Sequence, residues 1–161
     1  MPRVIRCIAS GTIVVAMGLV WPSAGLGQTS SDVAVIVNRD VPINNLTISE
    51  LRRIVLGDRE FWPGGLRITL LMRAPVAHER DVVLGIYRMS EAQFRQHWIA
   101  KVFRAETAVG PRLVYSARDA VDRVNQSPGA LAFLDTPSVS SDLKVVKIDG
   151  HLPGEPGYPL R

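Results

Sequence analysis

The residue best placed to bind a ligand is an arginine at the end of an apolar stretch. Arg73 closes the β-rich run 67–73, directly before a turn that contains a proline. A helix is expected to follow over 78–88, so the Arg73 guanidinium would lie beside the first amides of that helix, at Ala77 and His78. Guanidinium groups and helix N-termini both attract anions. The pattern therefore predicts a site for a small anion, phosphate-like or carboxylate.

Each candidate also has a purely structural explanation. Arg73 can be a surface arginine that pairs with Glu79 or Asp81. His78 and Glu79 could suggest a metal or acid–base pair, but HERDV lacks the two-histidine zinc pattern, and acids in a first helical turn complement the helix dipole. Ser116 could offer a hydroxyl to a ligand, or could cap a helix that starts at the next residue. The candidate ligand-binding residues are Arg73, Ala77, His78 and Ser116.

No motif in the sequence indicates catalysis or a cofactor. The sequence has no convincing Ser-His-Asp order, nucleotide-binding loop or paired carboxylates. His97 and His151 lie far apart and share no ligand spacing, so no metal site is predicted. We therefore expect a protein that is not an enzyme and uses no cofactor, with a hydrolase as the third-ranked alternative.

The start of the chain has the layout of a secretory signal peptide. Arg3 and Arg6 precede an apolar run over 7–21, and small residues follow up to Gly27. The run is shorter than the roughly 20 residues that a membrane-spanning helix needs. Cleavage is expected after Gly25 or Gly27 and would leave a mature chain that is periplasmic or secreted.

The mature chain has the size of one domain. The predicted organisation is a signal peptide at 1–27, an α/β domain at 28–150 and a Pro/Gly-rich C-terminal tail at 151–161. The single cysteine, Cys7, lies in the signal, so the mature protein can form no disulfide. The net charge of +4 includes two signal arginines. Without them the chain is too weakly basic to predict nucleic-acid binding.

Strand and helix patterns alternate along the rest of the sequence. Hydrophobic runs predict strands over 33–37, 67–73, 112–115, 130–134 and 143–148. Helical spacing and capping residues predict helices from Thr47 or Ser49 to about 55, and over 78–88, 90–103 and 117–126. The predicted fold class is α/β, a single layered α/β sandwich with a mixed, partly parallel sheet.

A series of short motifs follows this order of elements. A strand ends in asparagine (VAVIVN), a helix closes on Leu56 and Gly57, Trp62 precedes paired glycines, and a strand ends at Arg73. The series continues through SPGALAFLD and ends with YPL at 158–160. Together these motifs resemble the phosphate-type periplasmic substrate-binding proteins of ABC importers. The resemblance implies the fold of one lobe of a type II periplasmic binding protein.

Two departures from that family are visible. Its members are about twice as long and close two lobes over the ligand, whereas this chain lacks the segment that begins the first lobe. In the family, a Ser-Gly-Thr type turn after the arginine holds the anion with hydroxyls and amides. Here the turn runs from Ala74 to Glu79 without a hydroxyl. The donors that remain are Arg73 and the helix amides.

The resemblance implies an exported solute-binding module that binds phosphate or another small anion for ABC-type uptake. Its partners would be a small anion and a membrane permease or sensor protein, and a homodimer could rebuild a cleft from two single lobes. The alternative is a ligand-free protein-interaction or sensing module. That alternative predicts an exposed apolar patch larger than a few hundred Å².

Overall fold

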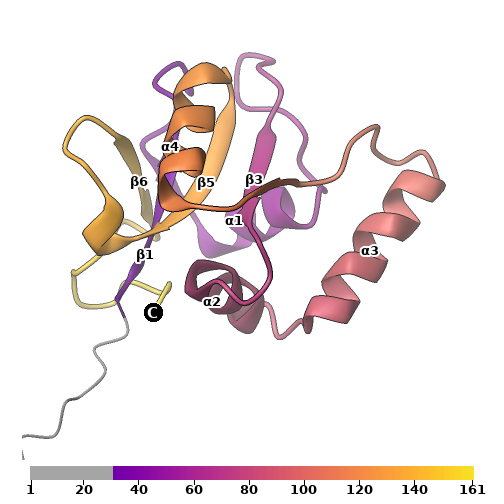
Figure 1. Cartoon of the computed structure of the whole chain (residues 1–161). Helices are drawn as coiled ribbons and strands as arrows, with labels where there is room; N and C mark the ends of the chain where they lie inside the picture. The colour runs from indigo at the N-terminus through magenta and orange to yellow at the C-terminus, as the bar shows by residue number, and fades with distance from the viewer. Residues whose placement is uncertain (1–30) are drawn as a thin grey trace, which may run out of the picture.

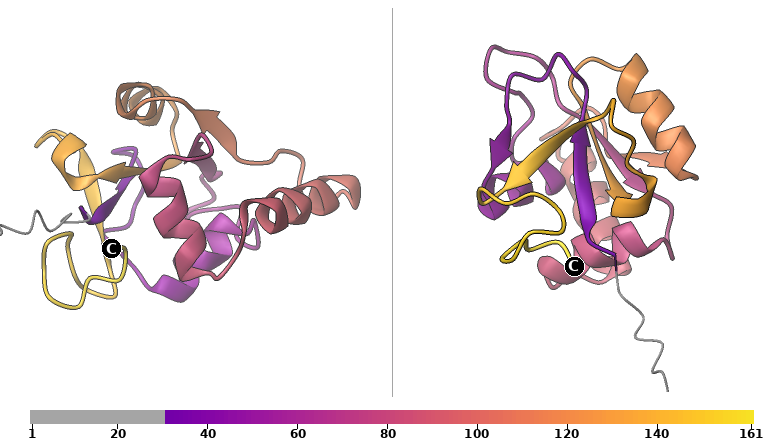
Figure 2. Two further views of the ribbon diagram at one scale, coloured as in Figure 1. Left: turned by 60° about the horizontal axis from the view of Figure 1, so that its bottom comes forward. Right: turned by 90° about the vertical axis from the view of Figure 1, so that its left-hand side faces the viewer.

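The computed structural model describes residues 31–161, which form a mixed sheet with helices on both faces (Figures 1 and 2). The strands are β1 (Val33–Val37), β2 (Asn45–Leu46), β3 (Thr69–Arg73), β4 (Arg112–Val114), β5 (Ala130–Asp135) and β6 (Lys144–Ile148). The helices are α1 (Ile48–Val55), α2 (His78–Ile86), α3 (Glu91–Phe103) and α4 (Ala117–Gln126), with a 3-10 turn, η1 (Thr136–Ser138). The predicted signal at 1–27 lies outside the described residues.

The strand order is β2-β6-β1-β5-β3-β4, which confirms the predicted mixed sheet. β3 runs parallel to both β4 and β5, while β1 runs antiparallel to β5 and β6. The carboxyl ends of β3, β4 and β5 therefore meet along one side of the sheet, which we call the carboxyl edge. This edge is where open α/β sheets usually hold ligands.

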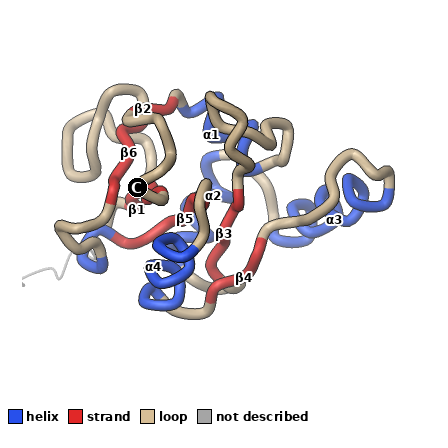
Figure 3. The backbone as a smooth tube through the Cα atoms, turned by 90° about the horizontal axis from the view of Figure 1, so that it is seen from above, coloured by secondary structure: helices blue, strands red, loops and turns tan. Residues whose placement is uncertain are grey.

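The two faces of the sheet carry separate cores. Alternate β1 residues such as Val35 pack with Phe133 and with α1, α2 and the start of α3. Ile36 and Leu134 face the other way and pack against Ala120 and Val124 of α4. The resulting arrangement has α1 on one side of the sheet and α4 on the other (Figure 3). Every β1 residue is buried, as its unbroken β-branched run predicts.

Three polar residues act as helix caps. Asn38, directly after β1, donates from Nδ2 to the carbonyl of Val124 at 2.7 Å and so caps the C-terminal end of α4. Thr47 caps α1 in a capping box with Glu50, which decides between the two caps that the sequence allowed. Ser90 forms the predicted capping box of α3 with Gln93.

The turn before β3 is tied to the turn before β5. Trp62 Nε1 donates to the carbonyl of Gly129 at 2.9 Å, and the same carbonyl accepts from the amide of Thr69 at 3.1 Å. Gly129 has a φ of +77°, and a Cβ there would lie 2.1 Å from the carbonyl oxygen of Arg67. A side chain at this position is therefore excluded both by conformation and by space.

The C-terminal segment 151–161 is irregular, as its proline and glycine content predicts, but it packs into the core. Tyr158 and Leu160 are almost fully buried. The Tyr158 hydroxyl donates to the carbonyl of Val33 at 2.7 Å, and the amide of Val33 donates to the carbonyl of Leu160 at 2.8 Å. The segment thus extends the hydrogen bonding beside β1 instead of forming the loosely specified tail that its composition suggests.

The predicted elements agree with the structure to within about two residues, with two additions. The sequence predicts a loop at 42–45, yet Asn45–Leu46 form the short strand β2 parallel to β6. The 3-10 turn after β5 is also new. Among residues 31–161, no helix has the length and apolar character needed to cross a membrane.

We predict that Gly129→Ala destabilises the fold far more than Gly64→Ala. Both glycines have positive φ, so both substitutions carry a conformational cost of about 1–2 kcal/mol. Only at Gly129 does the added methyl meet backbone, so the loss there should reach about 3 kcal/mol or more. Urea unfolding of a protein of residues 28–161 measures the difference. Equal losses would contradict the assigned role of the Gly129 turn.

Candidate anion site at the carboxyl edge

The candidate residues gather where β3 and β4 end. Arg73 pairs in register with Val114, so the two strands finish side by side. α2 begins shortly after β3, and α4 shortly after β4. Hydrogen bonds from Arg123 and from the amide of Tyr115 lower the pKa of the Asp119 carboxyl in the first turn of α4, and the charge of Arg73 makes a smaller contribution in the same direction. The structure thus brings the start of α4 into the electrostatic range of the Arg73 guanidinium.

Arg73 is held by an ion pair within its own edge. Its Nε donates to Oε1 of Glu79 at 3.1 Å, and the side chains are 15% and 5% exposed, respectively. This is one of the two partners that the structural explanation of Arg73 allowed. The pair leaves Arg73 Nη1 buried and without a hydrogen-bond partner. A buried donor without a partner is uncommon in folded proteins and calls for an explanation.

A second arginine, which the sequence analysis did not single out, holds the end of β3 in place. Arg80 Nη1 donates to the carbonyl of Arg73 at 2.8 Å. Its Nε and Nη2 reach the two carboxylate oxygens of Glu91 at 2.7 and 2.6 Å. The hydrogen bonds from Arg80 lower the pKa of the Glu91 carboxyl. Arg80 therefore links β3 to the start of α3. The sequence showed no sign of this link, because Arg80 and Glu91 are eleven residues apart and form no local motif.

The turn between β3 and α2 is strained. Val76 has a φ of 74° and an exposed side chain. A β-branched residue in this region is unusual and costs free energy. Ala77 follows as the N-cap of α2 and has no side-chain oxygen to bond the first amides of the helix. The amides of His78 and Glu79 have no acceptor in the described part of the chain and are left to solvent or to a ligand, whereas the Ala77 amide donates to the carbonyl of Ala74 at 3.3 Å.

His78 and Ser116 already have protein partners. His78 Nδ1 lies 2.7 Å from Oδ1 of Asp135, at the end of β5. Ser116 Oγ accepts from the amide of Asp119 at 3.0 Å, which is the cap that the structural explanation predicts. The carboxyl edge therefore also holds the acidic side chains of Glu79, Asp119 and Asp135. Among residues 31–161, no group of three or more potential metal ligands comes together.

No protein-family model matches the chain, and no curated protein sequence matches it. Solved structures match it in fold. The chain is similar to an ABC-type phosphate transport receptor from Vibrio cholerae, with 19% identity and a TM-score of 0.61 over 76% of this chain and 48% of that one. It is also similar to PstS from Borrelia burgdorferi, with 15% identity and a TM-score of 0.63 over 81% and 54% of the two chains.

A third similar structure contains bound phosphate. It is a phosphate ABC transporter substrate-binding protein from Clostridium perfringens with bound phosphate, at 18% identity and a TM-score of 0.60, over 74% of this chain and 46% of that one. The chain has the fold of phosphate-type substrate-binding proteins. It spans about half the length of the structures that it matches. The resemblance in motif order is thereby confirmed at the level of fold.

Two cavities lie away from the four candidate residues. One is an open groove of about 610 Å³ between α3 and β4, lined mainly by apolar side chains. Ile99, Val102, Phe103 and Leu113 line it and are exposed, Phe103 to 91%. α3 extends away from the sheet at this place (Figure 1).

We predict that Val76→Gly leaves stability unchanged or raises it by up to about 1 kcal/mol. The substitution relieves a positive φ at an exposed side chain, and this gain offsets the entropy that glycine adds to the unfolded chain. Val109→Gly is the matched control, because Val109 is also an exposed loop valine and is not among the residues with positive φ. The control should lose about 0.5–1 kcal/mol. A larger loss for Val76→Gly in thermal unfolding would show that this turn is unstrained.

Proposed function

We propose that this protein is an exported solute-binding module that captures phosphate or a related small anion reversibly at its carboxyl edge. The anion would then pass to a membrane permease for ABC-type uptake. Support comes from the fold, which is that of proteins named for phosphate transport, one of them with phosphate bound. Further support comes from the donors that the edge leaves without protein partners.

The observation that carries the proposal is the free donor of Arg73. Nη1 is buried and unpartnered, although Nε of the same guanidinium is fully engaged with Glu79. An anion oxygen at Nη1 would complete the hydrogen bonding of the group. Charge-assisted hydrogen bonds of this kind contribute about 1.5–3 kcal/mol each. Arg73 would act as the main electrostatic donor.

The amides at the start of α2 supply the remaining donors. No side-chain cap occupies the first amides of the helix, and those of His78 and Glu79 have no backbone partner among residues 31–161, whereas the Ala77 amide donates to the carbonyl of Ala74 at 3.3 Å. The partial positive charge of a helix N-terminus adds to the attraction. Ser116 could turn its hydroxyl to the same ligand only by giving up its bond to the amide of Asp119. It would therefore be a secondary contact.

The acidic neighbours set the kind of anion that this edge favours. Glu79 already balances the charge of Arg73, and its carboxylate would repel a dianion that approaches Nη1. Phosphate affinity should consequently be modest, and monoanionic carboxylates become competitors. The ligand panel must therefore include both classes.

Isothermal titration of the mature protein with phosphate, sulfate, acetate and succinate tests the proposal. At least one anion should bind, and Arg73→Gln should weaken that binding by about tenfold to a hundredfold through the lost charge-assisted bond. Arg53→Gln is the control, since Arg53 is an exposed arginine of α1, outside the carboxyl edge. If no anion binds, or if Arg73→Gln binds anions as tightly as the wild type, anion capture at the carboxyl edge is contradicted.

Glu79→Gln should change the same titration in the opposite direction. The amide keeps a hydrogen bond to Arg73 but removes the charge that opposes a dianion, so phosphate affinity should rise by about tenfold. The variant should also lose stability, because Arg73 is left as a largely buried unpaired charge. Phosphate should restore part of that loss by mass action. A Glu79→Gln protein that is destabilised but indifferent to phosphate would argue against Arg73 as the donor.

The protein-interaction alternative makes a different forecast for these titrations. It predicts no anion binding and assigns the function to the exposed apolar face of α3, where Phe103 and Ile99 lie. A wild-type protein that folds normally but binds no anion would favour the protein-interaction alternative. Binding that depends on Arg73 would instead leave the solute-binding proposal in place.

A further inference from the structure

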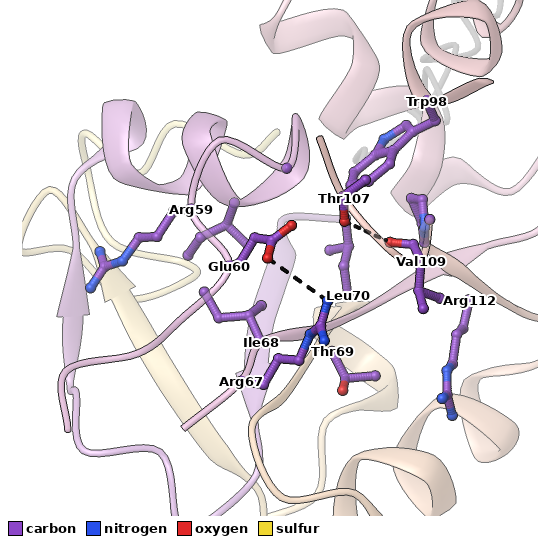
Figure 4. A pocket seen from close by; sticks show the side chains of 14 residues that line it. Arg59, Glu60, Arg67, Ile68, Thr69, Leu70, Trp98, Thr107, Val109 and Arg112 are labelled. Atoms are coloured by element: carbon purple, nitrogen blue, oxygen red, sulfur yellow. Dashed lines mark hydrogen bonds and ion pairs between the residues drawn. The ribbon is translucent and has the colours of Figure 1, made fainter. Parts of the chain in front are cut away.

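A second cavity lies at the opposite end of β3 from Arg73. It has a volume of about 200 Å³ and is lined by the end of α1, the start of β3, α3 and the loop before β4 (Figure 4). We propose that this cavity binds a small zwitterion, an α-amino acid with a short side chain. The inference is independent of the proposed anion site, because the two share no residue.

The first support is an unpaired carboxylate oxygen. Glu60 Oε1 is buried and has no hydrogen-bond partner, while Oε2 is 3.8 Å from Arg67 Nη2, which is long for an ion pair. In the close view, the Glu60 carboxylate reaches from its loop toward the space bounded by Thr107 and Leu70 (Figure 4). A deprotonated carboxylate only accepts hydrogen bonds, so its natural ligand is a donor with positive charge. A primary ammonium group fits this requirement.

The second support is an aromatic wall in the same cavity. Trp98 of α3 is 9% exposed and lines the cavity, and its Nε1 is also buried without a partner. Gly57 allows this arrangement, because a Cβ there would lie 2.5 Å from the Trp98 ring. An indole ring attracts a cation to its face, which adds to the pull of Glu60 on an ammonium group.

The third support is the positive rim. Arg67 and Arg112 both line the cavity and are exposed, so they can move to meet a ligand carboxylate. Arg59 also lines it, but its guanidinium is committed to Glu50 and to the carbonyl of Phe61 and points away from the space (Figure 4). The Glu60 carboxylate, on a side chain that is 30% exposed, and the two guanidinium groups at the mouth match a ligand that carries both charges.

The volume limits the size of that ligand. At about 30 Å³ for each water molecule in the liquid, 200 Å³ corresponds to about seven non-hydrogen atoms. Glycine, alanine and serine are within this limit, whereas aromatic amino acids are not. Thr107 has a hydroxyl 3.3 Å from the carbonyl of Val109, a long bond that the hydroxyl can exchange for a ligand. The side chain of the ligand would face Ile68 and Leu70.

Titration of the ¹⁵N-labelled mature protein with alanine, propionate and ethylamine tests the inference. Alanine should shift the indole resonance of Trp98 and leave that of Trp62 in place, because Trp62 does not line the cavity. Propionate lacks the ammonium group and ethylamine lacks the carboxylate, so each should bind at least tenfold more weakly than alanine. A Trp98 resonance that no probe moves, or that propionate moves as readily as alanine, would overturn the proposal.

Variants identify the groups responsible. Glu60→Gln should weaken alanine binding by at least tenfold, and Asp122→Asn, which removes the same charge at an exposed site on α4, should leave it unchanged. Arg112 has an exposed side chain, and Arg112→Gln should weaken alanine binding several-fold but leave ethylamine binding unaffected. This variant still tests the proposal if Glu60→Gln folds poorly. Wild-type alanine affinity in either cavity variant would count against the assigned geometry.

Discussion

The hydrogen bond from the Trp62 indole to the carbonyl of Gly129 fixes the geometry on which the rest of this protein depends. It joins the turn before β3 to the turn before β5, and the amide of Thr69 reaches the same carbonyl. The parallel strands β3 and β5 are thereby held in register from their first residues. Their last residues, Arg73 and Asp135, must then lie at the same edge of the sheet. The candidate site follows from a contact at the opposite end of the strands.

Local signals in the sequence were sufficient for most of the fold. The capping box of Ser90 and Gln93 and the apolar run of β1 are formed by neighbours in the chain, so their residues specify them directly. Features that depend on distant partners were not predictable in this way. β2 is two residues long and exists only through β6, and Tyr158 is buried because its hydroxyl reaches Val33. Neither partnership leaves a periodic pattern.

In the candidate site too, the sequence indicated features set by neighbouring residues but not those set by distant partners. Arg73 could be singled out because it stands at a strand end before a turn, yet its choice of Glu79 over Asp81 depends on the position of α2. The role of Arg80 was not visible, since its bonds to the Arg73 carbonyl and to Glu91 join three separate elements. The motif residue Asn38 could be seen in the sequence, but its function as the cap of α4 could not. Several motif residues that suggest a binding-protein fold thus hold the scaffold instead of a ligand.

The central claim is that the unpartnered donors at the carboxyl edge receive an anion. The most direct measurement is a phosphate titration of a ¹⁵N-labelled protein of residues 28–161, followed through the amides of His78 and Glu79 and the guanidinium of Arg73. The account predicts shifts concentrated on these groups, with smaller ones at the start of α4. Shifts that are absent, or that spread evenly over the exposed arginines, would contradict it.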